Sequence, residues 1–265
     1  MRLYEIKDDE NVRSVGTLIY YEKAGAFIIE LQEYLDEWTA PLLFTKYVKD
    51  GIYTIPRDIS FLWVRERIVP ESRQNIGSIL SRHRLKAYDE MKFLEISNGR
   101  CSQDSMYIKR IGEMPAYVSE RVSKNLTDCI PLDDHILLCF FAEGTVKKVS
   151  LGKLTSVKDI DKLLRNEDLY LSCTIGPGGY SATFNDSIDI LASLLYTAAE
   201  SIPFCASDFI TFAQRGLTDT TESCGILECS RQNLDYMLSR NQLRPVKNNV
   251  KGNLYLKGDV ISKRW

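Results

Sequence analysis

The chain has 265 residues, of which 44% are hydrophobic and 10% aromatic. This content is enough to build packed cores and excludes wholesale disorder, and the length predicts two or three domains. The seven cysteines are odd in number and irregularly spaced, without a Cys-x-x-Cys pair, so a disulfide framework and a zinc ribbon are both disfavoured. The charged N-terminus lacks a signal-peptide pattern and the longest apolar run, residues 136–142, is too short to cross a bilayer; we therefore expect a cytoplasmic protein without membrane segments.

Charge is unevenly distributed along the chain. From Arg215 to the C-terminus there are nine Lys/Arg and five Asp/Glu, a net charge of +4, whereas the first 214 residues hold 25 and 31, a net charge of −6. A basic tail on an acidic body indicates a module that binds a polyanion, although four charges also suit an ordinary solvated surface.

The first half of the chain alternates between strand and helix patterns. Residues 13–56 are expected to be mainly strand, with a hairpin in "SVGTLIYYEKAGAFIIEL" around a Glu-Lys-Ala-Gly turn. Ser72 is expected to cap a helix that carries Ile76, Ile79 and Leu80 at helical spacing, and a second short helix is expected after Asp89.

The middle of the chain returns to strands. Residues 126–151 predict a hairpin that turns at Glu143-Gly144, residues 157–165 a short helix, and "LYLSCTIGPGGYSATFN" a second hairpin. The Gly-Pro-Gly-Gly turn has no following Lys, so it is read as a turn rather than a phosphate cradle. Asp133-Asp134-His135 is interpreted as an exposed turn rather than an acid–base site. Residues 189–214 are expected to be helical.

The C-terminal fifty residues predict a helix–turn–helix followed by a hairpin and a closing helix after Asp259. A first helix carries Cys224, Ile226 and Leu227, a turn lies at Glu228-Cys229, and Ser230 caps a second helix. On that second helix a count of 100° per residue gathers the apolar side chains Leu234, Met237 and Leu238 on one side.

The opposite side of the second helix is polar and suited to reading base edges, because Arg pairs with guanine and Asn or Gln with adenine. Donors near the hairpin tip are placed to meet phosphate. The candidate DNA-binding residues are Ser230, Arg231, Gln232, Asn233, Tyr236, Arg240, Lys247, Asn248, Lys251 and Asn253.

The segment "SRQNIGSILSRHRL" from Ser72 echoes "SRQNLDYMLSRNQL" from Ser230, with eight of fourteen positions identical. The first copy has Pro70 upstream and no helix at turn distance before it, and a helix rather than a hairpin is expected after it. We therefore expect only the copy at Ser230 to read DNA. Duplication of the device is the alternative.

The stretch from Thr218, through "CSRQN" to "LYLKGDV", resembles the small winged helix–turn–helix domains of the excisionase and MerR-type class. The resemblance implies recognition through Ser230, Arg231, Gln232, Asn233 and Tyr236, with phosphate contacts from the wing. Such domains are also used for protein contacts alone, which is the alternative.

The N-terminal part is similar to the segment that leads into HipA-like serine/threonine kinases of Firmicutes. The resemblance is carried by "FLWVRERIVPESR" and "GRCSQDSMYI", in which Gly99, Asp104, Tyr107 and Ile108 match. With histidines only at 83 and 135, no H-x-D catalytic loop can be built, so the resemblance implies the leader without the kinase.

Residues of about 125–200 resemble a small bacterial family of unknown function found near toxin–antitoxin genes. The resemblance rests on "FFAEGTVKKVSL" and "GPGGYSATFNDSIDI", where Glu143 replaces an Asp and Phe184 a Trp. It implies a compact α+β unit and no chemistry.

Together these patterns predict a multi-domain α+β protein: a mixed α/β leader at 1–120, a small antiparallel α+β domain at 121–214 and a winged helix–turn–helix at 215–265. The leading hypothesis is a DNA-binding regulator, an antitoxin-type autorepressor that acts as a homodimer on an inverted repeat and binds a protein partner such as a HipA-like kinase. The alternative is a non-catalytic interaction or inhibitor protein, of phage origin for example, whose winged domain does not read DNA. A hydrolase or transferase is disfavoured because no nucleophile–base motif is present, and neither a cofactor nor a metal is expected.

Overall fold

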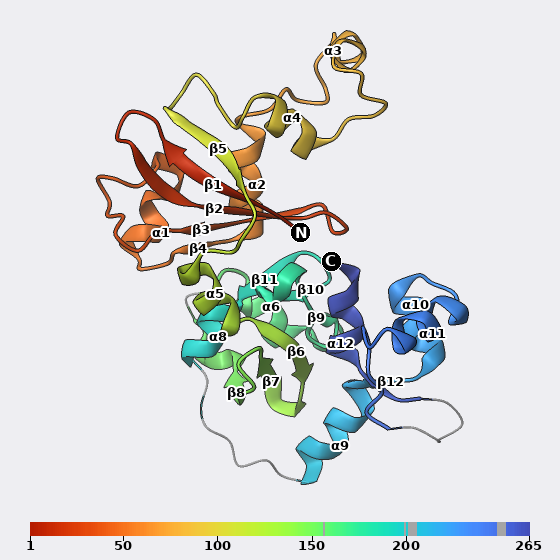
Figure 1. Cartoon of the computed structure of the whole chain (residues 1–265). Helices are drawn as coiled ribbons and strands as arrows, with labels where there is room; N and C mark the ends of the chain where they lie inside the picture. The colour runs from red at the N-terminus through yellow and green to blue at the C-terminus, as the bar shows by residue number, and fades with distance from the viewer. Residues whose placement is uncertain (156, 199, 201–205, 248–252) are drawn as a thin grey trace. The chain divides into compact units, whose positions relative to one another are not determined.

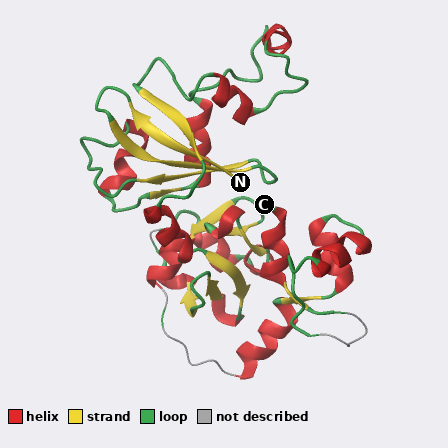
Figure 2. Cartoon of the chain, in the orientation of Figure 1, coloured by secondary structure: helices red, strands yellow, loops and turns green. Residues whose placement is uncertain are grey.

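The computed structural model describes residues 1–265 except 156, 199, 201–205 and 248–252. The chain forms two compact units, Met1–Ser119 and Glu120–Trp265 (Figure 1). Both units combine helices with antiparallel sheets, so the fold is α+β, as predicted (Figure 2). The predicted central and C-terminal segments, on either side of residue 215, belong to the same compact unit.

The first unit is built on a five-stranded antiparallel sheet with the order β4-β3-β2-β1-β5. The predicted hairpin is confirmed as β2–β3, with Tyr21 paired to Ala26 at the turn. Its strands are β1 (Arg2–Asp8), β2 (Arg13–Tyr21), β3 (Ala26–Leu31), β4 (Thr54–Ile55) and β5 (Met106–Ile111). Its helices are α1 (Thr45–Lys49), α2 (Arg57–Arg65), α3 (Ile76–Arg82) and α4 (Glu90–Ile96), with a 3₁₀ turn at Leu42–Phe44; α5 (Ala116–Ser123) spans the boundary between the units.

The prediction of mainly strand over residues 13–56 is wrong for the second half of that range. Residues 42–49 form the 3₁₀ turn and α1, and only Thr54–Ile55 returns to the sheet. Phe44 and Val48 are both buried and lie four residues apart, which is helical spacing. Their burial on one face makes this segment helical.

The residues that carry the kinase-leader resemblance have structural roles in the first unit. The Arg67 side chain is 1% exposed, lies over the Trp63 ring at 3.8 Å from the ring centroid, and forms an ion pair with Asp104. Gly99 has φ +68°, and a Cβ there would lie 2.9 Å from Ile108. Packing explains Gly99 and Ile108, and the ion pair with the buried Arg67 explains Asp104.

The prediction that Ser72 caps a helix is wrong. Helix α3 begins at Ile76 after Asn75, and no side chain caps it. The side chain of Asn75 instead accepts a hydrogen bond from Arg73 Nε, 2.9 Å away. None of the seven residues of α3 is buried, whereas the helix predicted after Asp89 is confirmed as α4, with Asp89 capping Lys92 N.

The second unit contains two three-stranded antiparallel sheets and a two-stranded ribbon, ordered β6-β7-β8, β11-β10-β9 and β12-β13. The predicted hairpins at Glu143-Gly144 and Gly176–Gly179 are confirmed as β7–β8 and β9–β10. The strands are β6 (Leu126–Pro131), β7 (Ile136–Phe141), β8 (Val146–Ser150), β9 (Cys173–Ile175), β10 (Ser181–Phe184), β11 (Ile188–Leu191), β12 (Leu217–Thr218) and β13 (Tyr255–Leu256). The helices are α6 (Ile160–Arg165), α7 (Glu167–Leu171), α8 (Ala192–Ala198), α9 (Ala206–Arg215), α10 (Thr220–Leu227), α11 (Arg231–Ser239) and α12 (Lys257–Ile261). Short 3₁₀ turns lie at Asp133–His135, Leu151–Lys153, Pro177–Gly179 and Ser262–Arg264.

The expectation of helix throughout 189–214 is corrected at its start. Ile188 and Ile190 are buried two residues apart and pair with β10, so residues 188–191 form strand β11 before α8 begins. Period-two burial against a neighbouring strand decides this segment.

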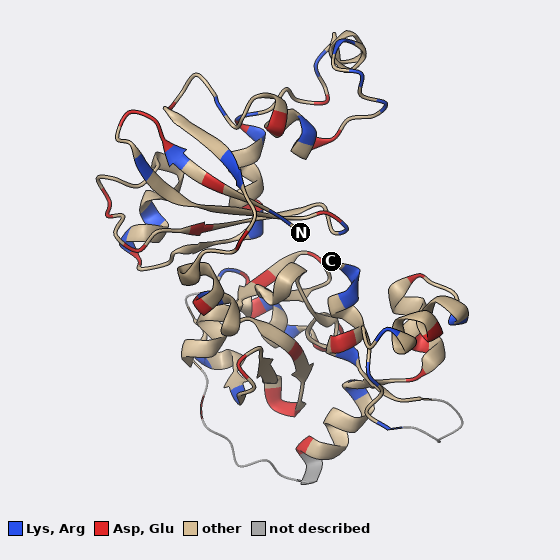
Figure 3. Cartoon of the chain, viewed as in Figure 1, with Lys and Arg blue, Asp and Glu red and all other residues tan. Residues whose placement is uncertain are grey.

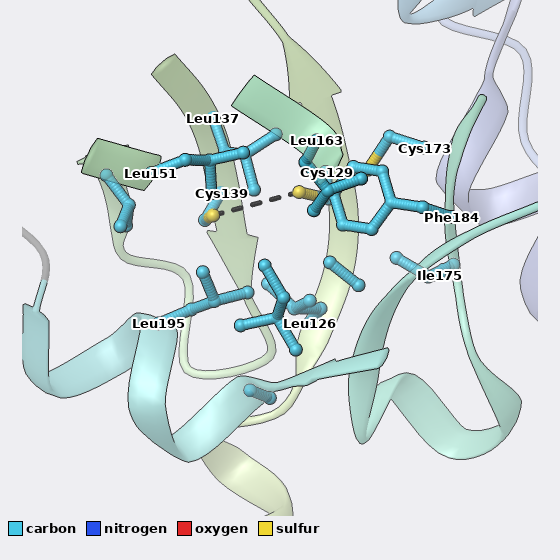
Figure 4. Close-up of a cluster of buried hydrophobic side chains, with 14 of the residues drawn as sticks. Leu126, Cys129, Leu137, Cys139, Leu151, Leu163, Cys173, Ile175, Phe184 and Leu195 are labelled. Atoms are coloured by element: carbon cyan, nitrogen blue, oxygen red, sulfur yellow. Dashed lines mark hydrogen bonds between the residues drawn. The ribbon is translucent and has the colours of Figure 1, made fainter. Parts of the chain in front are cut away.

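The main core of the second unit packs side chains from β6, β7, β9 and β10 with Leu163 and Leu195 (Figure 4). Cys129 and Cys139 face each other across β6 and β7 with their sulfur atoms 3.8 Å apart. The hydrogen bond with Cys129 raises the pKa of the Cys173 thiol, and burial acts in the same direction. The six cysteines in the described part of the chain are free thiols, of which Cys129, Cys139 and Cys173 are buried.

Candidate nucleic-acid interface

The first helix of the candidate interface is fixed at both ends by local interactions. The Asp219 side chain accepts hydrogen bonds from Thr221 N and Glu222 N. The Glu222 side chain in turn accepts a hydrogen bond from Asp219 N, and together these bonds form a capping box at the start of α10. The helix ends at Glu228, whose φ of 52° lies in the left-handed region and turns the chain sharply.

The second helix, α11, starts as predicted. Ser230 Oγ accepts a hydrogen bond from Asn233 N, and the helix runs from Arg231 to Ser239. The turn of Glu228 and Cys229 therefore joins two short capped helices, the arrangement of a helix–turn–helix.

A separate small core holds the two helices and the following hairpin together. Leu234 is fully buried and packs with Leu243, Tyr255 and Val260, while Met237 and Leu238 lie against the same cluster. The predicted apolar side of α11 is thereby confirmed. The cluster that covers it also contains residues from the hairpin and α12.

The opposite face of α11 is open to solvent. Arg231, Gln232 and Asn233 are exposed, as are Ser239 and Arg240, and Tyr236 is 52% exposed. Two local contacts order this face: Arg240 lies over the Tyr236 ring at 5.2 Å, and Arg231 Nη2 donates to Thr221 Oγ1 of α10 at 3.2 Å. Every α11 residue of the predicted set is therefore exposed, as is the cap Ser230 at the start of the helix.

The hairpin after α11 is present at its base. Lys247 and Leu254 form an antiparallel bridge, and Val246 N donates to Leu254 O at 2.6 Å. Lys247 is exposed, whereas Asn253 is half-buried and its amide donates to the Tyr255 hydroxyl at 3.2 Å. The predicted tip residues Asn248 and Lys251 lie outside the described residues.

The closing helix begins three residues earlier than predicted. It runs from Lys257, so Asp259 lies inside its first turn rather than before it. Gly258 N donates to Asp128 Oδ2 of β6 at 2.9 Å. This bond joins the helix directly to the β6-β7-β8 sheet, which we call the central sheet.

Sequence reasoning missed Asp128, which is the buried charge at this junction. Its carboxylate is 7% exposed and accepts from both Gly258 N and Cys129 N. Burial raises the pKa of Asp128 to about 6, against the effect of these two hydrogen bonds and of the Lys257 charge. The available signal was an aspartate within the otherwise apolar strand segment "LTDCIPL".

The candidate interface carries charges of both signs (Figure 3). Its exposed cations include Arg231, Arg240 and Lys247, but Asp235 is also exposed on α11 and Glu228 in the turn. The interface therefore offers hydrogen-bonding groups and mixed charge rather than a uniformly basic surface.

Two other segments with acid–base or phosphate-binding residue types form turns. Asp133–His135 is a 3₁₀ turn before β7, as predicted, and His135 Nε2 lies 3.7 Å from Glu167. Gly176 and the 3₁₀ turn that follows it form the confirmed hairpin turn. Within the described ranges, no group of three or more His, Cys, Asp or Glu side chains is placed to hold a metal ion.

Comparison with family models, with curated proteins and with solved structures finds no match in any of the three. No helix in the described part of the chain is both long and apolar enough to cross a membrane.

Proposed function

We propose that this protein is a DNA-binding transcriptional regulator in which α11 reads bases in the major groove and the following hairpin contacts phosphate. The observation that carries the proposal is the exposed face of α11, where Arg231, Gln232, Asn233 and Tyr236 lie together on a helix anchored by the buried Leu234. An exposed face of this composition can form hydrogen bonds to base edges.

The finer form of the proposal is an antitoxin-type autorepressor that acts as a homodimer on an inverted repeat. A single domain of fifty residues buries little surface on DNA, and a second copy supplies the missing contacts. Phe209 and Ile210 of α9 are 59% and 55% exposed. They supply apolar surface just before residues 215–265, which we call the winged segment. Phe209→Glu should convert a dimer to a monomer in light scattering, with the exposed Thr197→Glu of α8 as control. A wild-type protein that is monomeric both free and on DNA would remove the dimer from the proposal.

The test of DNA binding is fluorescence anisotropy with the DNA upstream of the protein's own gene and with a scrambled duplex, over a range of salt concentrations. Arg231→Ala and Gln232→Ala should each reduce discrimination between the duplexes by roughly 1–3 kcal/mol. Lys247→Ala should weaken both complexes equally and reduce the salt slope by about one unit.

The echo at Ser72 provides matched controls, because Arg73→Ala and Gln74→Ala change identical residues on the exposed segment before α3. Both should leave DNA affinity unchanged. If they weakened specific binding as much as the α11 variants did, without unfolding the protein, the assignment to α11 would be wrong. If the wild type bound both duplexes with the same affinity at every salt concentration, sequence reading would be contradicted.

A second function, binding of a protein partner, is favoured by an apolar protrusion on the first unit. Trp38 is 86% exposed and Leu42 is 94% exposed. An Asp36 turn holds the segment, since Asp36 Oδ1 accepts from Trp38 N at 3.0 Å and Thr39 N at 2.9 Å. An exposed tryptophan is a common anchor of protein interfaces. A kinase-like protein is the partner that we propose, and if the protein did not read DNA, this would remain its function as a non-catalytic interaction protein.

The partner proposal is tested by pull-down with the full chain from the native host. Trp38→Ala and Leu42→Ala should each reduce recovery of a kinase-like protein at least tenfold, the effect of removing an anchor that contributes about 2 kcal/mol or more. Val12, 84% exposed in a different turn, gives the matched control Val12→Ala. Equal recovery with all three variants would show that this protrusion is not the contact surface.

A further inference from the structure

A cavity of about 460 Å³ lies inside the second unit, between the central sheet and the winged segment. Residues of β6 and of the α7–β9 region line one side, and the end of α9, β12, α10 and α12 line the other. Its volume falls within the range of small-molecule sites in proteins.

The cavity wall combines apolar side chains with polar and charged ones. Leu171 and Leu217 are partly exposed, while Ile130 and Ile261 are buried in the adjoining cores. The main apolar lining residues are Ile130, Leu171, Leu217, Ile226 and Ile261. A ligand that fills this space should therefore have an apolar body.

The acidic groups of the lining are already engaged. Asp128 Oδ1 accepts from Cys129 N at 2.8 Å, and Asp128 Oδ2 accepts from Gly258 N at 2.9 Å. Glu222 Oε2 accepts from Asp219 N, 3.2 Å away, in the capping box. Because backbone N–H groups already donate to these carboxylates, they do not indicate a cationic ligand.

The two cationic side chains of the lining, Arg215 and Lys257, differ in their hydrogen-bonding partners. Arg215 Nη1 donates to Pro131 O, and Nη2 lies 3.9 Å from Asp133. Lys257 is half-buried, and its charge acts on the nearby Asp128 carboxylate, whose pKa it lowers, but no hydrogen bond or ion pair joins its ammonium group to a residue that the structure describes. Its ammonium group has three donors, and a partly buried charge of this kind is stabilised when it is paired with an anion.

We infer that this cavity is a binding site for a small amphipathic organic anion, whose carboxylate or sulfonate pairs with Lys257 while its apolar body packs against Ile130, Leu217 and Ile226. Such a ligand would contact β6 and the winged segment together. Lys257 N donates to Gly216 O at 2.8 Å, and the next residue donates to Asp128, so the ligand would adjoin the backbone junction between the two parts. Any effect of the ligand on operator affinity rests on the proposed DNA binding, whereas occupation of the cavity does not.

The experiment uses the full chain and the fluorescent anion 8-anilinonaphthalene-1-sulfonate, with no DNA present. Fluorescence should rise on binding and fall when octanoate is added as a competitor. Lys257→Met removes the cation, and Leu171→Trp fills the cavity from its partly exposed rim. Each should raise the dissociation constant of the probe at least about tenfold. Lys257→Met removes a charge-assisted hydrogen bond to the probe, and Leu171→Trp occupies the volume that the probe needs.

Two further variants serve as controls. One keeps the positive charge at position 257, and the other removes a positive charge outside the cavity. Lys257→Arg keeps the charge and should keep the dissociation constant within about threefold. Lys158→Met removes an exposed lysine outside the cavity and should have no effect. Circular dichroism and thermal melting are measured for every variant, and Leu171→Trp decides the outcome if Lys257→Met fails to fold.

Weakened binding in both cavity variants, with wild-type behaviour in the two controls, supports the inference. It is overturned if the wild type does not enhance the fluorescence, if octanoate does not compete, or if either folded cavity variant binds the probe as tightly as the wild type. Since the readout involves no DNA, failure of the ligand site and failure of the DNA proposal are distinguishable.

Discussion

Substitution of Gly258 by Ala tests the junction between strand β6 and helix α12. A Cβ at this position would lie 2.2 Å from Thr127 O, 2.6 Å from Asp128 Cβ and 2.6 Å from Asp128 Cγ. The nearest of these atoms belongs to the backbone of β6, so α12 must move away from the strand to relieve the overlap. This movement also lengthens the 2.9 Å hydrogen bond from Gly258 N to Asp128.

The expected cost has two parts. Overpacking of a close contact typically costs about 1–3 kcal/mol. Weakening a hydrogen bond to a buried carboxylate adds about 1–3 kcal/mol. We therefore expect Gly258→Ala to lower the free energy of unfolding of the second unit by about 2–6 kcal/mol.

Gly225 supplies a matched control in the same unit. It lies in α10, and a Cβ there would meet nothing within 4 Å. Gly225→Ala should be neutral or stabilise the protein by up to about 1 kcal/mol, because alanine loses less backbone entropy in a helix. The two variants make the same chemical change with opposite expected signs.

The assay is urea unfolding followed by far-UV circular dichroism, with midpoints compared at constant slope. Calorimetry of the same proteins identifies which transition moves. If Gly258→Ala unfolded at the same urea concentration as the wild type, the close approach of α12 to β6 and the reasoning from it would be refuted.

Three further outcomes follow from the same contacts. The raised pKa of Asp128, about 6 against an ordinary 3.8, means that the folded state binds the proton more tightly than the unfolded state. Stability should therefore rise as pH falls from 7 towards 4, by up to about 3 kcal/mol, and Asp128→Asn should flatten this trend in urea titrations at several pH values. Leu234→Ala should cost about 2–5 kcal/mol, whereas Ile76→Ala at the matching position of the echo should cost under about 1 kcal/mol in thermal melts, and equal costs would contradict the difference in burial. Ser230→Ala should cost about 0.5–2 kcal/mol through loss of the cap, while Ser72→Ala should change the urea midpoint by no measurable amount.

The sequence by itself determined the elements whose signals are local. The two helices of the helix–turn–helix and the hairpin turns at Glu143-Gly144 and Gly176–Gly179 are confirmed. Capping bonds, turn residues and apolar spacing act within a few residues, so they can be read before any tertiary contact is known. The polar face of α11 was predictable for the same reason, since it is the side opposite the apolar spacing.

Elements that depend on distant partners could not be read in this way. Ile188 and Ile190 form strand β11 only because β10 lies beside them. Asp128 stands in an apolar strand, and its role became visible only when Gly258, 130 residues away, was found to donate to it. The cavity beside Lys257 likewise exists because β6, α10 and α12 meet there.

The two copies of the Ser-Arg-Gln-Asn segment show most directly what tertiary structure decided. Ser230 caps α11, and Leu234, four residues later, is fully buried by the hairpin and α12. Ser72 caps nothing, and Ile76 at the matching position is only half-buried in a helix that starts four residues after the serine. The local sequence offers the same cap in both places, but a short helix is marginal until its apolar face is packed. Burial of Leu234, rather than the shared letters, is what makes the second copy a fixed helix with an exposed face.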